Sequence, residues 1–355
     1  MFITIENRFG GDADAGAWVQ ILAPTLGALF YPFVLEGFNA KVTQILELHG
    51  GTFSWPWLGA AMYLALAFAI PLLAMLAAIS LAGINRPTSA QLRATRTALL
   101  VVAAPALFTF VGVVLRMLHD PVPDGWLWAA CWALALALLV RSDNNAPARL
   151  MPRLDPGPLR AAHGVSALIL VMIFLAPLIS NHLMFSAGTG TYEAVKVLRH
   201  VYHTGILQPV VATLLLFQIG TGLFFAWRLT GTPSDAFRTF QIGSGIYLAV
   251  YVLGHMNWML TSARIDLGID AGGSPATGAP AGLLADAWNI RLVPHYWFAV
   301  FFMLAHLANG ARAIILAHGF SKTLADRFMV GSGVVAGIIA TVITLGMCGM
   351  RIRLV

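Results

Sequence analysis

Histidine is the residue type in this sequence whose number and placement could support chemistry. Ten histidines occur, and most of them open, close or interrupt the long apolar stretches in the second half of the chain. An ionisable side chain inside a membrane is costly and is usually paired or functional. A neutral imidazole is cheaper to bury than a charge and is a common metal ligand, and two imidazoles on facing helices can hold a haem iron. The candidates are His163, His182, His200, His203, His255, His295, His306 and His318.

His255 and His306 lie deepest in their apolar stretches and are the first candidates for metal ligands. Gly254 precedes His255, and Gly310 follows His306 by four residues on the same helical face. Glycine at these places would allow a macrocycle, or a neighbouring helix, to approach the imidazole. The alternative for both histidines is a hydrogen bond between helices. For the histidines nearer the ends of their stretches, the alternative is a hydrogen bond to lipid headgroups or loop carbonyls.

The composition indicates a membrane protein. Of the 355 residues, 59% are apolar and 10% are charged, and the mean hydropathy is +0.79. A soluble domain carries about 25% charged residues, so a chain this poor in charge cannot cover a water-exposed surface. The net charge of +6 does not indicate nucleic acid, because the basic residues stand in short loops between apolar stretches. Cys131 and Cys348 form no haem-attachment or zinc motif.

Eight stretches reach the roughly 20 apolar residues that a membrane-spanning helix needs, which predicts an all-α, polytopic transmembrane helix bundle. The apolar segment 17–35 is interrupted by Pro24 and Pro32, so we expect an interfacial or re-entrant piece there, with a ninth span as the alternative. Residues 37–48 are amphipathic and are expected to lie along the membrane surface. The eight predicted spans are 57–83, 97–118, 123–140, 162–186, 198–228, 240–263, 293–318 and 328–350.

The loops predict the orientation and the organisation of the chain. Basic residues gather in loops 84–96, 141–160, 229–239 and 319–327, which the positive-inside rule places in the cytoplasm. The glycine-rich loop 266–286 then lies outside. We expect an integral, multi-pass protein of a bacterial inner membrane. Its predicted parts are an N-terminal segment (1–55), a three-helix part (56–141), a cytoplasmic linker (142–160) and a five-helix part (161–355).

Residues 158–350 resemble the membrane-anchor cytochrome b of succinate dehydrogenase and fumarate reductase. Residues 160–166 (RAAHGVS) are similar to the start of that family's first helix. Residues 241–245 (QIGSG), followed by His255, are similar to its third helix, and residues 306–310 (HLANG) to its fourth. The resemblance implies that the five-helix part is cytochrome-b-like and binds haem b.

The resemblance also implies which residues hold the haem. His182 and His255 would ligate an outer haem, with His203 as the fallback partner of His255. An inner haem would use His306 and the position that Gln218 occupies here. Because glutamine is not a usual haem ligand, we expect one haem more strongly than two.

The expected function is that of a haem-b-carrying electron-transfer subunit, which exchanges electrons with a membrane quinone or a partner protein. A subunit is expected because the sequence has no flavin fingerprint, no iron–sulfur cysteines and no soluble domain. The alternative is a haem-free structural or assembly subunit. Gln218 favours it, and so does Gly164, which stands where some family members have a quinone-site arginine. A transporter is a third alternative, weakened by the scarcity of charged residues in mid-span.

Overall fold

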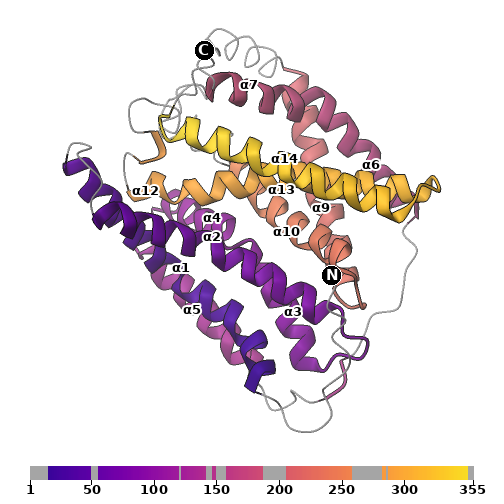
Figure 1. Cartoon of the computed structure of the whole chain (residues 1–355), viewed down its shortest axis with the longest axis horizontal. Helices are drawn as coiled ribbons and strands as arrows, with labels where there is room; N and C mark the ends of the chain where they lie inside the picture. The colour runs from indigo at the N-terminus through magenta and orange to yellow at the C-terminus, as the bar shows by residue number, and fades with distance from the viewer. Residues whose placement is uncertain are drawn as a thin grey trace.

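The computed structural model describes residues 15–48, 55–119, 121–140, 146–148, 157–186, 205–257, 282–284 and 287–350. All elements of these residues are helices, and none is a strand (Figure 1). They are α1 (Ala15–Glu47), α2 (Trp55–Ala82), α3 (Ser89–Val102), α4 (Ala104–Met117), α5 (Asp124–Leu139), α6 (Gly157–Leu170), the π-helix η1 (Val171–Leu175), α7 (Ala176–Ser186), α9 (Leu207–Leu229), α10 (Ala236–Asn257), the 3-10 helix η4 (Gly282–Leu284), α12 (Ala287–Ile290), α13 (Leu292–Ala317) and α14 (Lys322–Met347).

Within the described residues, six helices are long and apolar enough to cross a membrane, or seven spans if α3 and α4 form one. Four expected spans coincide closely with α2, the continuous α6–η1–α7 segment, α13 and α14. Helix α5 is apolar but shorter, and α10 is not among the six. The beginning of the expected span 198–228 and the end of 240–263 lie outside the described residues. The chain is therefore a helical, multi-pass membrane protein, while the count of eight spans stays a prediction.

The N-terminal region differs from the expected interfacial piece followed by a surface helix. Helix α1 is a single helix of 33 residues that continues through Pro24 and Pro32, and it qualifies as a membrane span. Proline inside a helix removes one backbone hydrogen bond and clashes with the preceding turn. Burial offsets that cost, because Phe38, Val42 and Ile45 on the expected surface segment pack into a core with α13 and α14.

The expected span 97–118 is interrupted by a sharp bend. Helices α3 and α4 meet at 69°. Pro105 stands in the first turn of α4, where its missing N–H is tolerated but cannot extend the hydrogen bonds of α3. Helix α3 also begins earlier than expected, because Thr88 and Gln91 form a capping box at its start.

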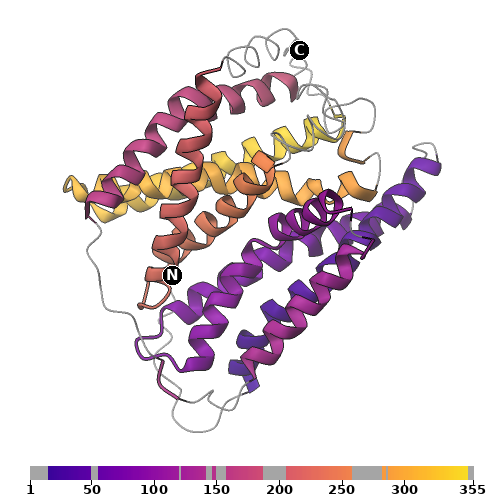
Figure 2. The same cartoon turned by 180° about the vertical axis from the view of Figure 1, so that it is seen from behind.

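One apolar core joins the N-terminal and C-terminal helices, although the linker separates them in sequence. Tyr247 of α10 and Phe298 and Phe302 of α13 are fully buried and pack in one cluster with Leu99 of α3 and Phe108 of α4. The rings of Tyr247 and Phe302 lie 5.1 Å apart. From behind, α9 lies against α6 and α10 (Figure 2). The predicted parts of the chain are therefore not separate in packing.

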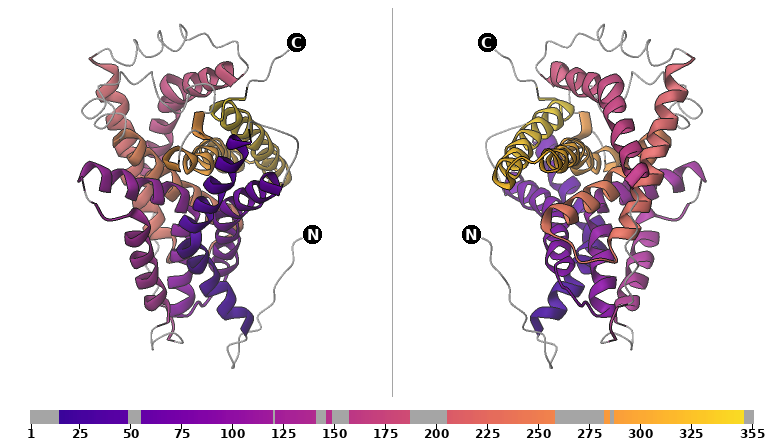
Figure 3. Two further views of the ribbon diagram at one scale, coloured as in Figure 1. Left: turned by 90° about the vertical axis from the view of Figure 1, so that its left-hand side faces the viewer. Right: turned by 90° about the vertical axis from the view of Figure 1, so that its right-hand side faces the viewer.

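Helices α13 and α14 lie between the α6–α7 segment and α1–α2 (Figure 3). At one end of this layer α7 approaches α14 so closely that Ser186 fills the space beside Gly346, and a Cβ there would overlap the serine side chain. Only glycine fits this crossing of the two helices, which fixes α7 and hence His182 relative to the rest of the bundle.

We expect Gly346→Ala to lower the free energy of unfolding by about 1–3 kcal/mol, the usual cost of overpacking a tight contact. The measurement is thermal or denaturant unfolding of the purified protein in detergent. Gly333→Ala on the same helix is the matched control, because an added Cβ there meets no atom within 4 Å. Equal effects of the two substitutions would contradict the prediction.

Candidate functional site

The described histidines of the C-terminal helices form an outer and an inner group. In the outer group, the ring of Tyr251 meets both His255 of α10, at 5.5 Å, and His295 of α13, at 4.9 Å. His182 of α7 stands between Ile179 and Leu183, which pack in one apolar cluster with Tyr296, and Tyr296 meets His255 edge-on. In the inner group, His163 of α6 contacts Thr221 of α9, and His306 of α13 contacts Gln241 and Ser244 of α10, the helix against which α9 packs. His182 and His255 thus lie in one region of the bundle, while a haem shared by the two stays a prediction.

Two of the predicted histidines cannot be placed. His203, the fallback partner of His255, and His200 both lie outside the described residues. His182 is therefore the expected partner of His255 that the described chain contains, and the role of His203 stays a prediction.

His182 has one ring nitrogen committed to the backbone. Its Nδ1 lies 2.8 Å from the carbonyl oxygen of Leu178, one turn earlier, and because a carbonyl only accepts, Nδ1 carries the hydrogen. This tautomer leaves the lone pair on Nε2, and a backbone hydrogen bond of this kind is what usually orients a metal-ligating imidazole.

A wide π turn precedes His182. Pro177 near the start of α7 has no N–H to continue the regular hydrogen-bond ladder, which accounts for the π-helix η1 before it. Such turns alter the angle between the residues on either side and are frequent at functional sites. The position of His182 relative to His163 therefore depends on this turn.

The imidazole of His255 is held by aromatic rings. It stacks on Tyr251 with the ring centroids 5.5 Å apart and 12° between the planes, and Tyr296 meets it edge-on at 6.5 Å. Tyr251 also lies 4.9 Å from the ring of His295. The same region contains a hydrogen bond of 2.6 Å from the hydroxyl of Tyr247 to the backbone oxygen of His295. These contacts orient His255 without a carboxylate.

The glycines near the histidines have different surroundings. A Cβ on Gly254 would lie 3.3 Å from Phe110 of α4, so this glycine allows α4 to approach α10. A Cβ on Gly310 would meet no atom within 4 Å. Gly245 lies closer to a histidine, because its Cβ would come within 3.1 Å of the His306 ring. Sequence reasoning gave Gly245 no role of its own, although it stands in the pattern QIGSG.

Both ring nitrogens of His306 are engaged. Nδ1 lies 2.9 Å from the hydroxyl of Ser244, and Nε2 lies 2.9 Å from the amide nitrogen of Gln241. The Ser244 hydroxyl donates to the Phe240 carbonyl at 2.7 Å, so it accepts from Nδ1–H. The Nε2 lone pair, the one that would face iron, therefore accepts from Gln241.

Gln218 makes hydrogen bonds to α6. Its amide nitrogen donates to the hydroxyl of Ser166 and to the carbonyl of His163, each at 2.7 Å. An amide nitrogen offers no lone pair to a metal, and here both of its hydrogens are used. The ring of His163 makes a further contact of 2.6 Å with the hydroxyl of Thr221 on α9.

The donor sets of the two groups differ in their fit to haem b. His182 presents a lone pair in the same region as the imidazole of His255, and bis-histidine ligation requires two imidazoles. In the inner group the Nε2 lone pair of His306 accepts from Gln241, and Gln218 is an amide, not a second imidazole. Among the described residues no cluster of three or more His, Cys, Asp or Glu side chains could hold a free metal ion.

An arginine that sequence reasoning missed lies above the outer group. Arg291, just before α13, donates to the carboxylate of Asp124 at the start of α5. Its guanidinium stacks over Trp288 at 4.2 Å and over Phe108 at 4.7 Å. Gly112 gives it room, since a Cβ there would lie 2.9 Å from the Arg291 guanidinium. The N-terminal helices thus fix the start of the helix that carries His295 and His306.

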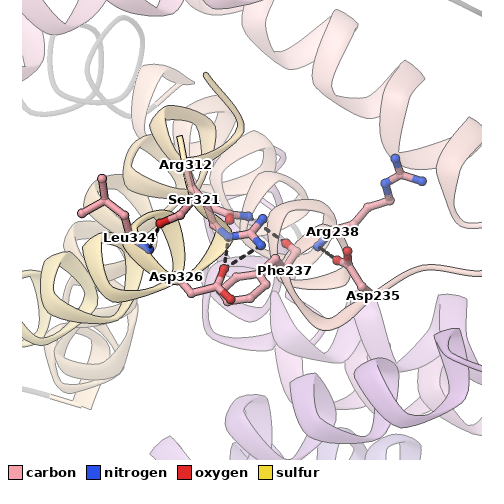
Figure 4. Close-up of polar contacts among 8 residues, drawn as sticks. Asp235, Phe237, Arg238, Arg312, Ser321, Leu324 and Asp326 are labelled. Carbon is pink, nitrogen blue, oxygen red and sulfur yellow. Dashed lines mark hydrogen bonds and ion pairs between the residues drawn. The ribbon is translucent and has the colours of Figure 1, made fainter. Parts of the chain in front are cut away.

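A second buried arginine fixes the other end of α13 (Figure 4). Arg312 donates to Asp326 of α14 from Nε at 2.8 Å and from Nη2 at 2.7 Å. Its guanidinium lies 3.7 Å above the ring of Phe237, whose carbonyl accepts from Asn309 at 2.7 Å. Arg238 in the same view points away from the group. These contacts join α10, α13 and α14 within a turn or two of His306.

Comparisons with protein-family models, with curated proteins and with solved structures find no match to this chain. The fold defines it as a multi-pass helical membrane protein with half-buried or buried histidines on several of the described helices. Membership of the succinate dehydrogenase and fumarate reductase anchor family stays a prediction from the sequence patterns.

Proposed function

We propose that this chain is a haem-b-carrying membrane subunit of an electron-transfer complex, with one haem held on the outer side by His182 and His255. The observation that carries the proposal is the state of His182, whose Nδ1–H is bonded to Leu178 so that Nε2 is left to coordinate. The half-buried imidazole of His255 lies in the same region, because Tyr296 meets it edge-on and packs in one cluster with the neighbours of His182, Ile179 and Leu183. This pairing was expected from the sequence patterns, and two imidazoles of this kind suit haem iron.

The protein's part in the chemistry would be binding and tuning. A bound haem b supplies reversible one-electron oxidation and reduction. The Leu178 carbonyl makes His182 a more basic ligand, and the stacked ring of Tyr251 orients His255. Burial among aromatic rings excludes water, which is a main influence on the reduction potential.

The proposed setting is a bacterial inner membrane, with protein partner subunits on at least one side. The chain would exchange electrons with a membrane quinone or with a partner protein. The arginine-rich loops would face the cytoplasm, and the glycine-rich loop would face outward. The haem group would then lie toward the outer side.

The test is an absorption spectrum of the purified protein, oxidised and dithionite-reduced. We expect the Soret and α bands of bis-histidine haem b in the wild type and their loss in His255→Ala. His318→Ala is the matched control, because the His318 Nδ1 also bonds a carbonyl one turn back, that of Ile314 at 2.9 Å, yet the residue is exposed at the end of α13. A folded wild-type protein without extractable haem would reject the proposal.

A second candidate is a haem-free structural or assembly subunit. The observation that favours it is the inner group, where Gln218 and His306 are hydrogen-bonded to neighbouring helices without any cofactor. If the outer histidines behaved in the same way, the protein would be colourless, and His255→Ala would lower stability but leave the spectrum unchanged.

A further inference from the structure

Four inner residues join α6 to α9 by side-chain hydrogen bonds. Gln218 of α9 donates to Ser166 and to the His163 carbonyl. The Thr221 hydroxyl donates to the Phe217 carbonyl at 2.6 Å, so it accepts the hydrogen of His163 Nδ1. Between apolar helices, interhelical hydrogen bonds of this kind contribute directly to association.

Three further residues join α10 to α13 in the same half of the bundle. The His306 ring lies between Gln241 and Ser244 and occupies the space left by Gly245. Because α9 packs directly against α10, the two sets are neighbours. We call the seven residues together the inner clasp: His163, Ser166, Gln218, Thr221, Gln241, Ser244 and His306.

We infer that the inner clasp takes the place of a second haem, and that Gln218 determines whether the chain forms the clasp or binds that haem. Both amide hydrogens of Gln218 are used on α6, which leaves only its carbonyl oxygen, and an amide oxygen is not a usual haem ligand. The Nε2 lone pair of His306 is occupied by Gln241. His306 is then a helix-packing histidine, and Gln218 is a specificity-determining residue for the number of haems. The inference builds on the proposed outer haem but depends on contacts that do not involve it.

Binding of a second haem would require two changes in the inner clasp. The family resemblance implies that a histidine at position 218 would supply the second imidazole that bis-histidine ligation needs. Gln241 would have to release Nε2 of His306. Its other amide atom, Oε1, is buried without a partner among the described residues, so replacing Gln241 by leucine removes a single hydrogen bond.

The experiment is the haem content per chain, measured by pyridine haemochrome after reconstitution with haemin. We expect one haem in the wild type and one in His306→Gln, with an unchanged spectrum, because glutamine can still bond Ser244. We expect two haems in the double variant Gln218→His/Gln241→Leu. Two haems in the wild type, or a loss of haem in His306→Gln, would overturn the inference. A folded double variant that takes up no further haem at saturating haemin would overturn the role of Gln218.

A second measurement separates this inference from the proposed function. If the wild type binds no haem, the proposed function fails, and the clasp is judged by unfolding in detergent. Gln218→Leu and Ser166→Ala should each lower the unfolding temperature. The combined variant Gln218→Leu/Ser166→Ala should lower it by less than the sum of the two shifts, because both substitutions remove the same hydrogen bond. Strictly additive shifts would overturn the clasp.

Discussion

Replacing His255 by methionine is expected to leave the haem bound and to raise its reduction potential. Methionine opposite histidine is a workable axial pair, and it favours the reduced iron more than two imidazoles do. Axial ligands set haem potentials over a span of about 0.8 V, so a shift on the order of 0.1 V is expected. Potentiometric titration of the absorption bands measures it, and the change of ligand has its own signature in electron paramagnetic resonance.

The same substitution at two other histidines gives the controls. His182→Met should produce a shift of the same sign, because His182 and His255 would ligate the same iron. His306→Met should change neither the potential nor the resonance spectrum, because its ring is bonded to Gln241 and Ser244. A shift with His306→Met and none with His255→Met would reverse the assignment of the ligands.

Much of the helical architecture could be predicted because it depends on local properties of the chain. The length of an apolar stretch fixes a span, and α2, α13 and α14 appear where their stretches predict them. The interfacial reading of α1 failed because Pro24 and Pro32 indicate a break, whereas burial against distant helices keeps α1 continuous. The strength of those contacts cannot be read from the segment itself.

The candidate site was predictable only in its residue types. His182 and His255 were candidates because of their places in the apolar stretches, and their pairing stays a prediction from the family resemblance. The hydrogen bond between Gln241 and His306 joins residues 65 positions apart, and that between Asp124 and Arg291 joins residues 167 apart. Such contacts require the rotation and depth of each helix, which packing determines and hydropathy does not.

Removing the carboxylate of Asp124 is expected to destabilise the fold by on the order of 3 kcal/mol, because a buried charge that loses its partner is left uncompensated. The side chains of Arg291 and Asp124 are 14% and 22% exposed, so water screens the pair only in part. Asp124→Ala would leave the Arg291 guanidinium between Phe108 and Trp288 and would remove the carboxylate that pairs with it among the described residues. Denaturant unfolding in detergent measures the effect.

The charge argument is distinguished from a loss of packing by removing both charges. Asp124→Asn/Arg291→Gln keeps hydrogen-bonding groups on both helices and buries no ion, so it should be clearly more stable than Asp124→Ala. Arg116→Gln is the control, since Arg116 is exposed and meets Trp288 only at 5.9 Å. A double variant as unstable as Asp124→Ala would contradict the charge argument. The close fit of the two side chains at Gly112 would then hold α13 against the N-terminal helices, because that fit depends on their shapes and not on their charges.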